Sequence, residues 1–239
     1  MDDGGWKSSA RAWIADMGET GDFGRQYVLD GPMVDRLRRL TRGAALDVGC
    51  GEGRFCRLLR AEGFEPVGLD PTPELLSAAR ARDPDGVYVE GRAEALDFAD
   101  GQFDLVVTYL SLIDIEGAQA AIAEMARVLR PGGTLLVANL SGFSTARAHE
   151  GWQRDLMGRL VHFAMDRYLE RRSTWERWRG ISIRNWHRPL SDYMQWFLGQ
   201  GLVLTHFDEP AATGGPPAKA ARYNRVPWYV ILEWRKPAA

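Results

Sequence analysis

The sequence predicts an α/β fold with a parallel β-sheet at its centre. Between residues 44 and 140, short apolar runs rich in β-branched residues alternate with segments of helical periodicity. This alternation is typical of repeated strand-helix-strand units. A chain of 239 residues is long enough for one sizeable α/β domain, whereas two domains would each be small. We therefore expect a single domain, with additions to a central sheet.

Five strands are expected in the alternating region, each a short apolar run. They are AALDV (44–48), PVGLD (66–70), GVYVE (86–90), FDLVVTY (103–109) and GTLLVANL (133–140). Three helices are expected between them, because apolar residues recur there at spacings that share one helical face. These residues are Phe55, Leu58 and Leu59, then Leu75, Leu76 and Ala79, then Ile122, Met125, Ala126 and Leu129.

The segments before and after residues 44–140 predict additions to this core. Residues 1–42 show no strand pattern and predict one or two helices outside the sheet, as an N-terminal helical cap. Residues 141–187 carry apolar residues at helical spacing and predict a helical insertion. Residues 188–239 predict a closing helix (190–201), a strand (202–207), a long connection rich in Pro, Gly and Ala, and a last strand (226–234).

Composition excludes several classes of protein. A net charge of -2 and a pI near 6.1 give no general basic excess, so nucleic acid and anionic membranes are not expected partners. Cys50 and Cys56 lie six residues apart, which fits free thiols in a reducing compartment better than a disulfide. The N-terminus lacks the pattern of a signal peptide, and no apolar run approaches the ~18 residues of a membrane span. We expect a soluble cytoplasmic protein without a metal site.

A glycine-rich turn follows the first strand, in ALDVGCGEGRF (45–55). Glycine lets a backbone approach a ligand closely, although a tight structural turn is the simplest alternative. A dinucleotide site needs a third small residue at the position of Arg54. The carboxylate of Glu52 is also unfavourable beside a pyrophosphate, whereas it suits the ammonium group of S-adenosylmethionine. The turn therefore favours S-adenosylmethionine over a dinucleotide.

Asp70 ends the second strand, about 20 residues after the turn. A carboxylate at this place can accept hydrogen bonds from both hydroxyls of a ribose. The alternative is that Asp70 caps the N-terminus of the helix that follows.

Five segments in order resemble the class I S-adenosylmethionine-dependent methyltransferases, in particular the small-molecule subgroup that includes ubiquinone- and menaquinone-biosynthesis-like enzymes. They are ALDVGCGEGRF, VGLDPTPELLSAARAR, GRAEALDF, FDLVVTYLSLIDI and EMARVLRPGGTLLVANL. The resemblance covers residues 43–140, as a donor-binding core. It implies a Rossmann-like sheet of seven strands in the order 3-2-1-4-5-7-6, with the last strand antiparallel and helices on both faces. Residues 141–187 would then form an acceptor cap, and residues 188–239 a closing helix and antiparallel strand pair.

The resemblance also implies roles for individual residues at the donor. The methionine part of the donor would contact Asp47, Gly49, Cys50 and Gly51, and the ribose would contact Asp70. The adenine would lie against Pro71, Thr72, Arg92, Ala93 and Glu94. The sulfur would lie beside Tyr109, Leu110 and Ser111. In similar proteins the N-terminal segment closes over the donor, which brings in Trp13 and Arg25. Arg25 would pair with the methionine carboxylate, with plain surface placement as its alternative.

Two residues depart from the family pattern. Arg92 stands where relatives commonly have an Asp that contacts adenine, and Asp114, in SLIDI, stands where they often have the second of two histidines. These departures leave open a catalytically degenerate, donor-binding regulatory protein. An NAD-linked oxidoreductase is the other alternative, against which Arg54 argues.

The acceptor side offers two candidate catalytic residues, His187 and Asp114. An oxygen or nitrogen acceptor gains from a base near the methyl group, whereas a carbon acceptor needs an electron-rich π-system. His187 lies in HRPLS, a segment that recurs near the acceptor in this subgroup; its alternative is a hydrogen-bonded residue at the start of a helix.

Five of the nine Trp fall between residues 152 and 196, which suits a flat or apolar acceptor, with plain core packing as the alternative. We expect in-line methyl transfer from S-adenosylmethionine to O, N or C of a small aromatic or apolar molecule, leaving S-adenosylhomocysteine. The enzyme would act as a monomer or homodimer, without nucleic acid and without a membrane span.

Overall fold

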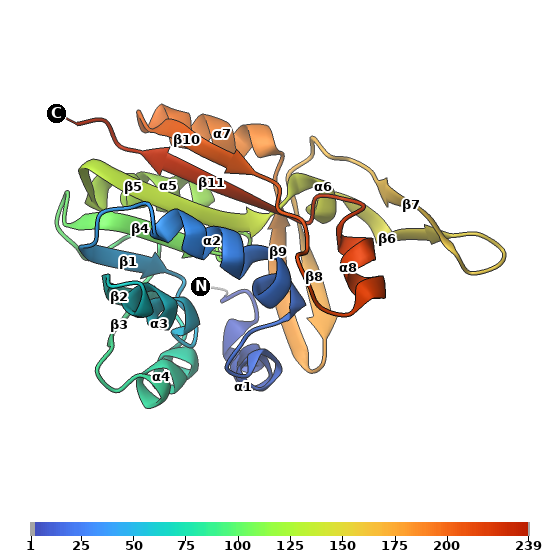
Figure 1. The fold of residues 1–239 in the computed structure, drawn as a ribbon, viewed down its shortest axis with the longest axis horizontal. Helices are drawn as coiled ribbons and strands as arrows, with labels where there is room; N and C mark the ends of the chain where they lie inside the picture. The colour runs from blue at the N-terminus through green and yellow to red at the C-terminus, as the bar shows by residue number, and fades with distance from the viewer. Residues whose placement is uncertain (1–2, 239) are drawn as a thin grey trace.

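The computed structural model describes residues 3–238, which are built around one seven-stranded sheet (Figure 1). The strand order is β3-β2-β1-β4-β5-β11-β10, and β11 runs antiparallel to both of its neighbours. Counted along the chain within this sheet, the order is 3-2-1-4-5-7-6, so the predicted α/β fold is confirmed. The strands are β1 (Ala44–Val48), β2 (Glu65–Asp70), β3 (Val87–Glu90), β4 (Phe103–Tyr109), β5 (Leu129–Leu140), β10 (Val203–Asp208) and β11 (Tyr229–Arg235).

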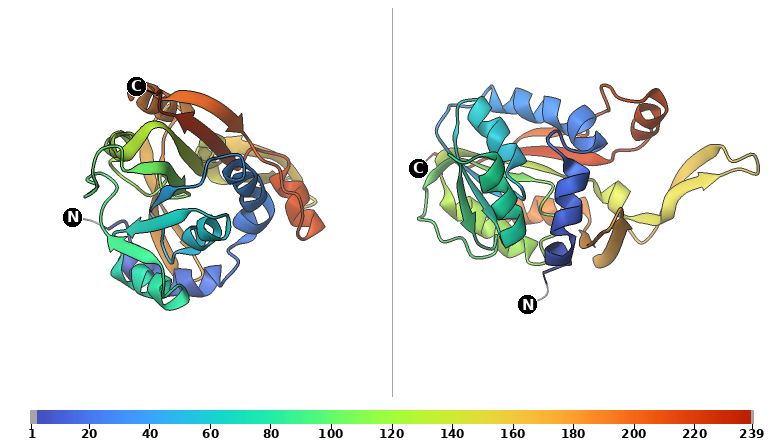
Figure 2. Two further views of the ribbon diagram at one scale, coloured as in Figure 1. Left: turned by 60° about the vertical axis from the view of Figure 1, so that its left-hand side comes forward. Right: turned by 90° about the horizontal axis from the view of Figure 1, so that it is seen from below.

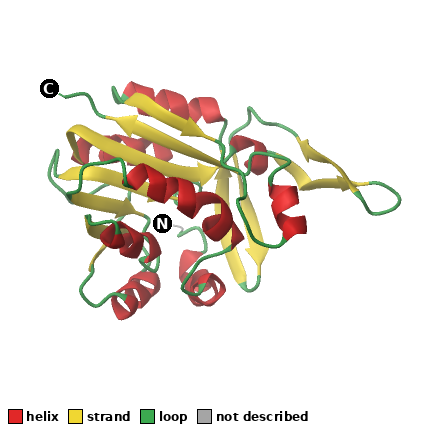
Figure 3. Cartoon of the chain, viewed as in Figure 1, coloured by secondary structure: helices red, strands yellow, loops and turns green. Residues whose placement is uncertain are grey.

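Helices cover both faces of the sheet (Figure 3). On one face, α5 (Ala118–Val128) and α7 (Leu190–Gly199) bury Ile122, Met125 and Phe197, and Phe197 stacks on Trp234 of β11 at 5.0 Å between ring centroids. On the other face, α2 (Asp30–Leu37) and α3 (Arg54–Ala61) share a second apolar core. The predicted stripe of α5 is buried at Ile122, Met125 and Ala126, whereas Leu129, which was predicted to continue it, begins β5.

The N-terminal segment is helical, as predicted. It consists of α1 (Trp6–Met17), a π-helical turn η1 (Arg25–Leu29) and α2, and α4 (Pro73–Arg82) follows β2. α1 packs against α4 and against the strand β9 (Ile181–His187), so it lies across the end of the sheet (Figures 1 and 2). None of the helices within residues 3–238 is long and apolar enough to cross a bilayer.

The prediction of a helical insertion at residues 141–187 was wrong. This segment forms two hairpins, β6 (Arg147–Arg154) with β7 (Leu160–Met165), and β8 (Arg172–Trp178) with β9; its one helix, α6 (Gly142–Thr145), is a single turn. The spacing of Trp175 and Trp178 matches a helix, but Arg179 and Gly180 have φ of 43° and 81° and form a two-residue turn. Positive φ at both positions is typical of type I′ hairpin turns, whose twist matches that of the paired strands.

The two hairpins lie in different places. β8–β9 runs alongside α1 at the end of the sheet, whereas β6–β7 projects away from the body of the molecule (Figures 1 and 2). The long connection between β10 and β11 contains a short helix that was not predicted, α8 (Pro217–Tyr223).

Candidate functional site

A cavity of about 500 Å³ opens at the C-terminal ends of β1, β2 and β4. Ligands of open α/β sheets bind at this edge, and the volume falls in the range of roughly 300–1,000 Å³ found for small-molecule sites. The loops after these strands line the cavity, and α1 and η1 cover it. Every residue predicted to bind the donor lines it: Trp13, Arg25, Asp47, Gly49, Cys50, Gly51, Asp70, Pro71, Thr72, Arg92, Ala93, Glu94, Tyr109, Leu110 and Ser111.

The glycine turn brings backbone close to two different neighbours. A Cβ on Gly49 would lie 2.3 Å from the Cβ of Ser111, so this glycine permits contact with the loop after β4. Gly51 has a φ of +54°, and no atom lies within 4 Å of the place where its Cβ would be. The bare backbone of Gly51 therefore faces open space in the cavity, where a ligand can approach it closely.

Asp70 is held with its carboxylate at the cavity. Its Oδ1 accepts a hydrogen bond from the amide of Thr72 at 2.8 Å, and its Oδ2 accepts one from the amide of Gly51 at 3.0 Å. Burial raises its pKa, and these two bonds oppose the rise. Thr72, not Asp70, occupies the cap position of α4, so the alternative role of Asp70 as a helix cap is not observed.

Asp47 is buried beside the turn with one oxygen unpartnered. Its Oδ2 accepts a weak hydrogen bond from Sγ of Cys56 at 3.4 Å, whereas its Oδ1 has no hydrogen-bond partner. Burial, together with the nearby charges of Asp70 and Glu52, raises the pKa of Asp47 to about 7, although the hydrogen bond from Cys56 opposes the rise. A cationic group of a ligand would offset this cost.

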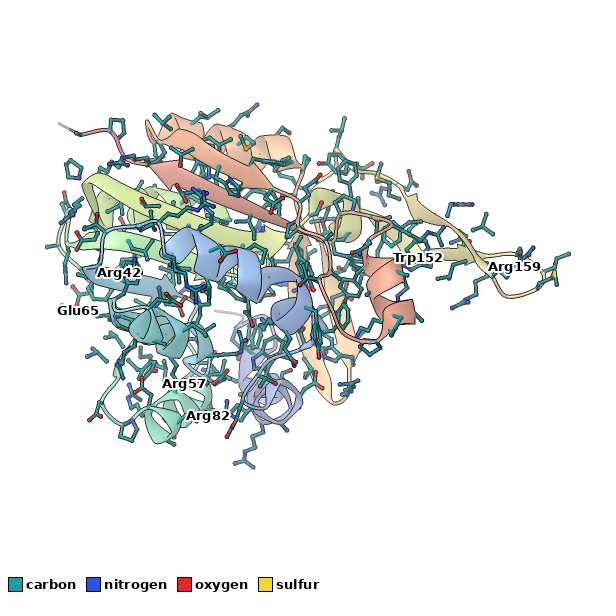
Figure 4. All side chains as sticks on the ribbon, in the orientation of Figure 1. Arg42, Arg57, Glu65, Arg82, Trp152 and Arg159 are labelled. Atoms are coloured by element: carbon teal, nitrogen blue, oxygen red, sulfur yellow. The ribbon has the colours of Figure 1, made fainter. Side chains whose placement is uncertain are left out.

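Glu52 does not have the role that the sequence suggested. Its Oε2 accepts from Arg57 at 2.9 Å and from Arg82 at 2.7 Å, and these arginines reach it from α3 and α4 (Figure 4). The charge of Glu52 is therefore compensated within the protein, and Asp47 is the acid left to meet an ammonium group.

At the far end of the cavity, Arg92 and Glu94 form an ion pair at 3.0 Å. The side chain of Arg92 is 44 % exposed. Glu94 is therefore already engaged with the residue that stands where relatives commonly have an Asp. The predicted backbone contact through Ala93, which is buried, is compatible with this arrangement.

Tyr109 and Arg25 connect the tip of β4 to the N-terminal segment. The hydroxyl of Tyr109 donates to Asp30 at 2.8 Å, and Arg54 forms an ion pair with the same carboxylate. The guanidinium of Arg25 pairs with Asp22 at 3.2 Å and lies 5.1 Å from the ring centroid of Trp13. Arg25 is thus not a plain surface residue, because it is part of the cavity wall.

Next to Tyr109, Leu110 adopts a positive φ of 58°. This conformation costs a non-glycine residue roughly 1–2 kcal/mol. The amide of Leu110 donates to the carbonyl of Ala138 at 2.8 Å, which fixes the residue at the point where the loop after β4 begins.

α1 is fastened over the cavity by the β8–β9 hairpin. The hydroxyl of Ser9 donates to the carbonyl of Ser182 at 3.0 Å and accepts from its amide at 2.9 Å. The indole of Trp178 donates to Asp16 at 3.1 Å. Trp6 and Trp13, on the cavity side of α1, pack edge to face with centroids 5.0 Å apart.

Asp114 also lines the cavity, in the loop after β4. The side-chain amide of Asn185, on β9, donates to its carboxyl, and burial raises the pKa of Asp114 to about 8. Arg188 also fixes this loop, because its buried guanidinium donates to the carbonyls of Leu112, Ile115 and Glu116 at 3.2, 2.6 and 2.9 Å. Asn185 and Arg188 were not predicted from the sequence; the turn at Arg179–Gly180 is the signal that would have placed Asn185 on a hairpin strand and Arg188 directly after that strand.

His187 lies outside the cavity, contrary to its predicted catalytic role. Its Nε2 donates to the carbonyl of Tyr168 at 2.8 Å, which leaves Nδ1 to accept from the hydroxyl of Thr145 at 2.7 Å. Burial lowers its pKa. Both ring nitrogens are occupied, so His187 holds α6 and the segment before β8 in place, as the alternative for this residue expected.

Comparisons with known proteins agree with this geometry. Residues 46–137 match the family model of a methyltransferase domain. A malonyl-[acyl-carrier protein] O-methyltransferase of Enterobacter lignolyticus is 36% identical over 116 residues, which are 48% of this chain and 45% of that protein. A demethylmenaquinone methyltransferase of Beutenbergia cavernae is 36% identical over 133 residues, 50% of this chain and 55% of that protein.

The chain thus spans about half the length of the curated relatives that it matches. The crystal structure of an S-adenosylmethionine dependent methyltransferase of Mesorhizobium loti shares the fold, with a TM-score of 0.75 and 24% identity. The match covers 91% of this chain and 100% of that one.

Residues 46–137 are thus similar to a methyltransferase domain, and the fold is that of solved S-adenosylmethionine-dependent methyltransferases. S-adenosylmethionine is the cofactor for which these solved structures are named, and the residues that line the cavity here fit it. The unpartnered Oδ1 of Asp47 suits its ammonium group, the open space at Gly51 admits its chain, and the fixed carboxylate of Asp70 can accept from its ribose.

Proposed function

We propose that this protein transfers a methyl group from S-adenosylmethionine to a small molecule. The observation that carries the proposal is that one cavity holds both a donor side, at Asp47, Gly51 and Asp70, and an acceptor side, at Asp114 and the Trp residues of α1.

Three charged residues would hold the donor. Asp70 retains free lone pairs after its two amide bonds and can accept from both ribose hydroxyls. Asp47 would pair with the ammonium group through its unpartnered Oδ1. Arg25, whose guanidinium faces the cavity, would pair with the methionine carboxylate.

Methyl transfer mainly requires that the acceptor atom, the methyl group and the sulfur be aligned and that water be excluded. S-adenosylmethionine, when bound, supplies a methyl group on a positively charged sulfur, which is already activated toward an in-line displacement. Tyr109, Leu110 and Ser111 lie where they would border the sulfur, and the strained Leu110 fixes the start of the loop that carries Asp114. α1 covers the cavity and would hold the acceptor against the methyl group while excluding water.

The acceptor is a small molecule with an apolar or aromatic body, in this proposal. The relatives are named for acting on a malonyl group of a carrier protein and on demethylmenaquinone, so they do not agree on an acceptor. The aromatic walls of the acceptor side come from α1, which lies outside the matched residues 46–137. Trp6 and Trp13 form these walls.

Methyl transfer can be tested with S-adenosylmethionine that carries an isotopic label on its methyl group. The purified protein is incubated with this donor and with small-molecule extracts, and the products are read by mass. We expect at least one labelled small molecule and a stoichiometric amount of S-adenosylhomocysteine, neither of which forms without the protein. Tight binding of S-adenosylhomocysteine without any transfer would instead support the regulatory alternative.

A further inference from the structure

We infer that the acceptor is an amine, whose nitrogen is bound by Asp114 and whose apolar or aromatic body lies against Trp6 and Trp13. This inference rests on the proposed function and names the substrate class of the same cavity. It starts from a carboxyl group that the donor does not use.

Asp114 is an acid of the cavity without a partner charge, and burial raises its pKa. Asp3 and Glu90 also line the cavity without an ion pair in the described part of the chain. Glu52, Glu94 and Glu116 are each paired with arginine. Asp47 and Asp70 lie on the donor side. Asp114 accepts a hydrogen bond from the neutral amide of Asn185 and forms no ion pair within the described residues 3–238. The charges of Arg25 and Arg188 act on it from further away and do not offset its burial, so its pKa stays raised, at about 8.

The surroundings of Asp114 suit an organic cation. Trp6 and Trp13 supply indole rings on the same cavity, and indole faces attract cations as well as apolar groups. One such cation–π contact is present in the cavity wall, where the guanidinium of Arg25 lies 5.1 Å from the ring centroid of Trp13. A carboxyl group together with aromatic walls is a chemistry that recognises an ammonium group with an apolar body.

Other acceptor classes fit less well. A carboxylate acceptor would add a second acid beside Asp114, where Arg184 is already paired with Glu116 and Lys7 lies at an exposed position. A neutral hydroxyl cannot offset the cost of an ionised carboxyl group in this place, whereas a positive charge does. The lining within residues 3–238 also contains no histidine that could act as a base for a hydroxyl.

The reaction balances with Asp114 as the proton acceptor. The amine binds as an ammonium ion and gives one proton to the carboxylate, which frees the nitrogen lone pair. The nitrogen then forms a bond to the methyl carbon while the carbon–sulfur bond breaks, and the electron pair of that bond stays on sulfur. The products are an N-methylammonium ion and S-adenosylhomocysteine, and the proton on Asp114 passes to solvent. A carboxyl group whose pKa lies near neutrality is suited to this transfer.

Three probes with one phenyl body test the inference: phenethylamine, 2-phenylethanol and 3-phenylpropionic acid. Their binding is measured by isothermal titration to the whole protein saturated with S-adenosylhomocysteine. We expect phenethylamine to bind at least about tenfold more tightly than the other two, the effect of one buried charge pair. Asp114→Asn should remove this preference, whereas Glu116→Gln, the same change at an exposed acid of the lining, should keep it.

The outcomes separate this inference from the proposed function. If S-adenosylhomocysteine itself does not bind, the proposed function fails before any probe is added. If it binds, the amine assignment is overturned by a preference for the alcohol or the acid, by amine binding that Asp114→Asn leaves unchanged, or by no amine binding at millimolar concentration.

Discussion

Asp47 shows how a single residue can oppose folding and still serve a site. Its pKa rises from 3.8 to about 7 in the folded state because the carboxyl group is buried. At pH values below about 4, Asp47 is protonated in both the folded and the unfolded state and does not change the free energy of unfolding. As pH rises toward 7 the unfolded state ionises first, so the folded state loses stability, by up to roughly 4 kcal/mol above pH 7.

Asp47→Asn should therefore raise the melting temperature of the donor-free protein, and more at pH 8.5 than at pH 5.5. The same variant should bind S-adenosylhomocysteine more weakly, because the partner of the ammonium group is lost. Thermal unfolding at the two pH values measures the first effect and titration the second, with Asp97→Asn, at an exposed position, as control. A melting temperature that falls equally at both pH values would contradict the assigned cost.

The positions of residues that lie close together in the chain could be predicted well from the sequence. The placement of Asp47, Gly51 and Asp70 depends on one strand, one turn and the next strand, so short spacings determine it. Glu52 was misjudged because Arg57 and Arg82, which compensate its charge, meet only when α3 and α4 pack side by side. His187 was misjudged for the same reason, since its partners Thr145 and Tyr168 are distant in sequence.

At the scale of elements, the seam between α1 and the β8–β9 hairpin depends on Gly5. Its φ is +87°, and a Cβ there would lie 2.2 Å from the carbonyl oxygen of Ser182. The sequence did not predict this seam, because it did not predict the hairpin. A helix and a hairpin more than 150 residues apart can be matched only through tertiary packing.

Gly5→Ala should separate α1 from β9 and weaken the cover over the cavity. We expect the dissociation constant of S-adenosylhomocysteine to rise about tenfold, since a left-handed residue and the clash together exceed ~1–2 kcal/mol. Gly31→Ala is the matched control, because nothing lies within 4 Å of its added Cβ in α2. Titration of both variants tests the seam, and unchanged affinity in Gly5→Ala would remove α1 from the donor site.

At the scale of the whole molecule, the proposed donor half and the proposed acceptor half of the cavity differ in origin. The donor half lies almost wholly within residues 46–137, where the motifs follow one another in the order of the strands. The acceptor half joins α1, the loop after β4 and β9, from three distant parts of the chain. This difference explains why the sequence predicted the sheet order and the donor residues, whereas the architecture of the acceptor cap required the structure.

Calorimetric titration of S-adenosylhomocysteine into the wild type and into Asp70→Ala is the most direct test of the donor site. The wild type should bind one molecule per chain. The variant should fold and bind roughly 100-fold more weakly or worse, because two hydrogen bonds to a charged group contribute about 1.5–3 kcal/mol each. A folded wild type that binds no S-adenosylhomocysteine, or equal affinity in the two proteins, would contradict the assignment of this cavity to the donor.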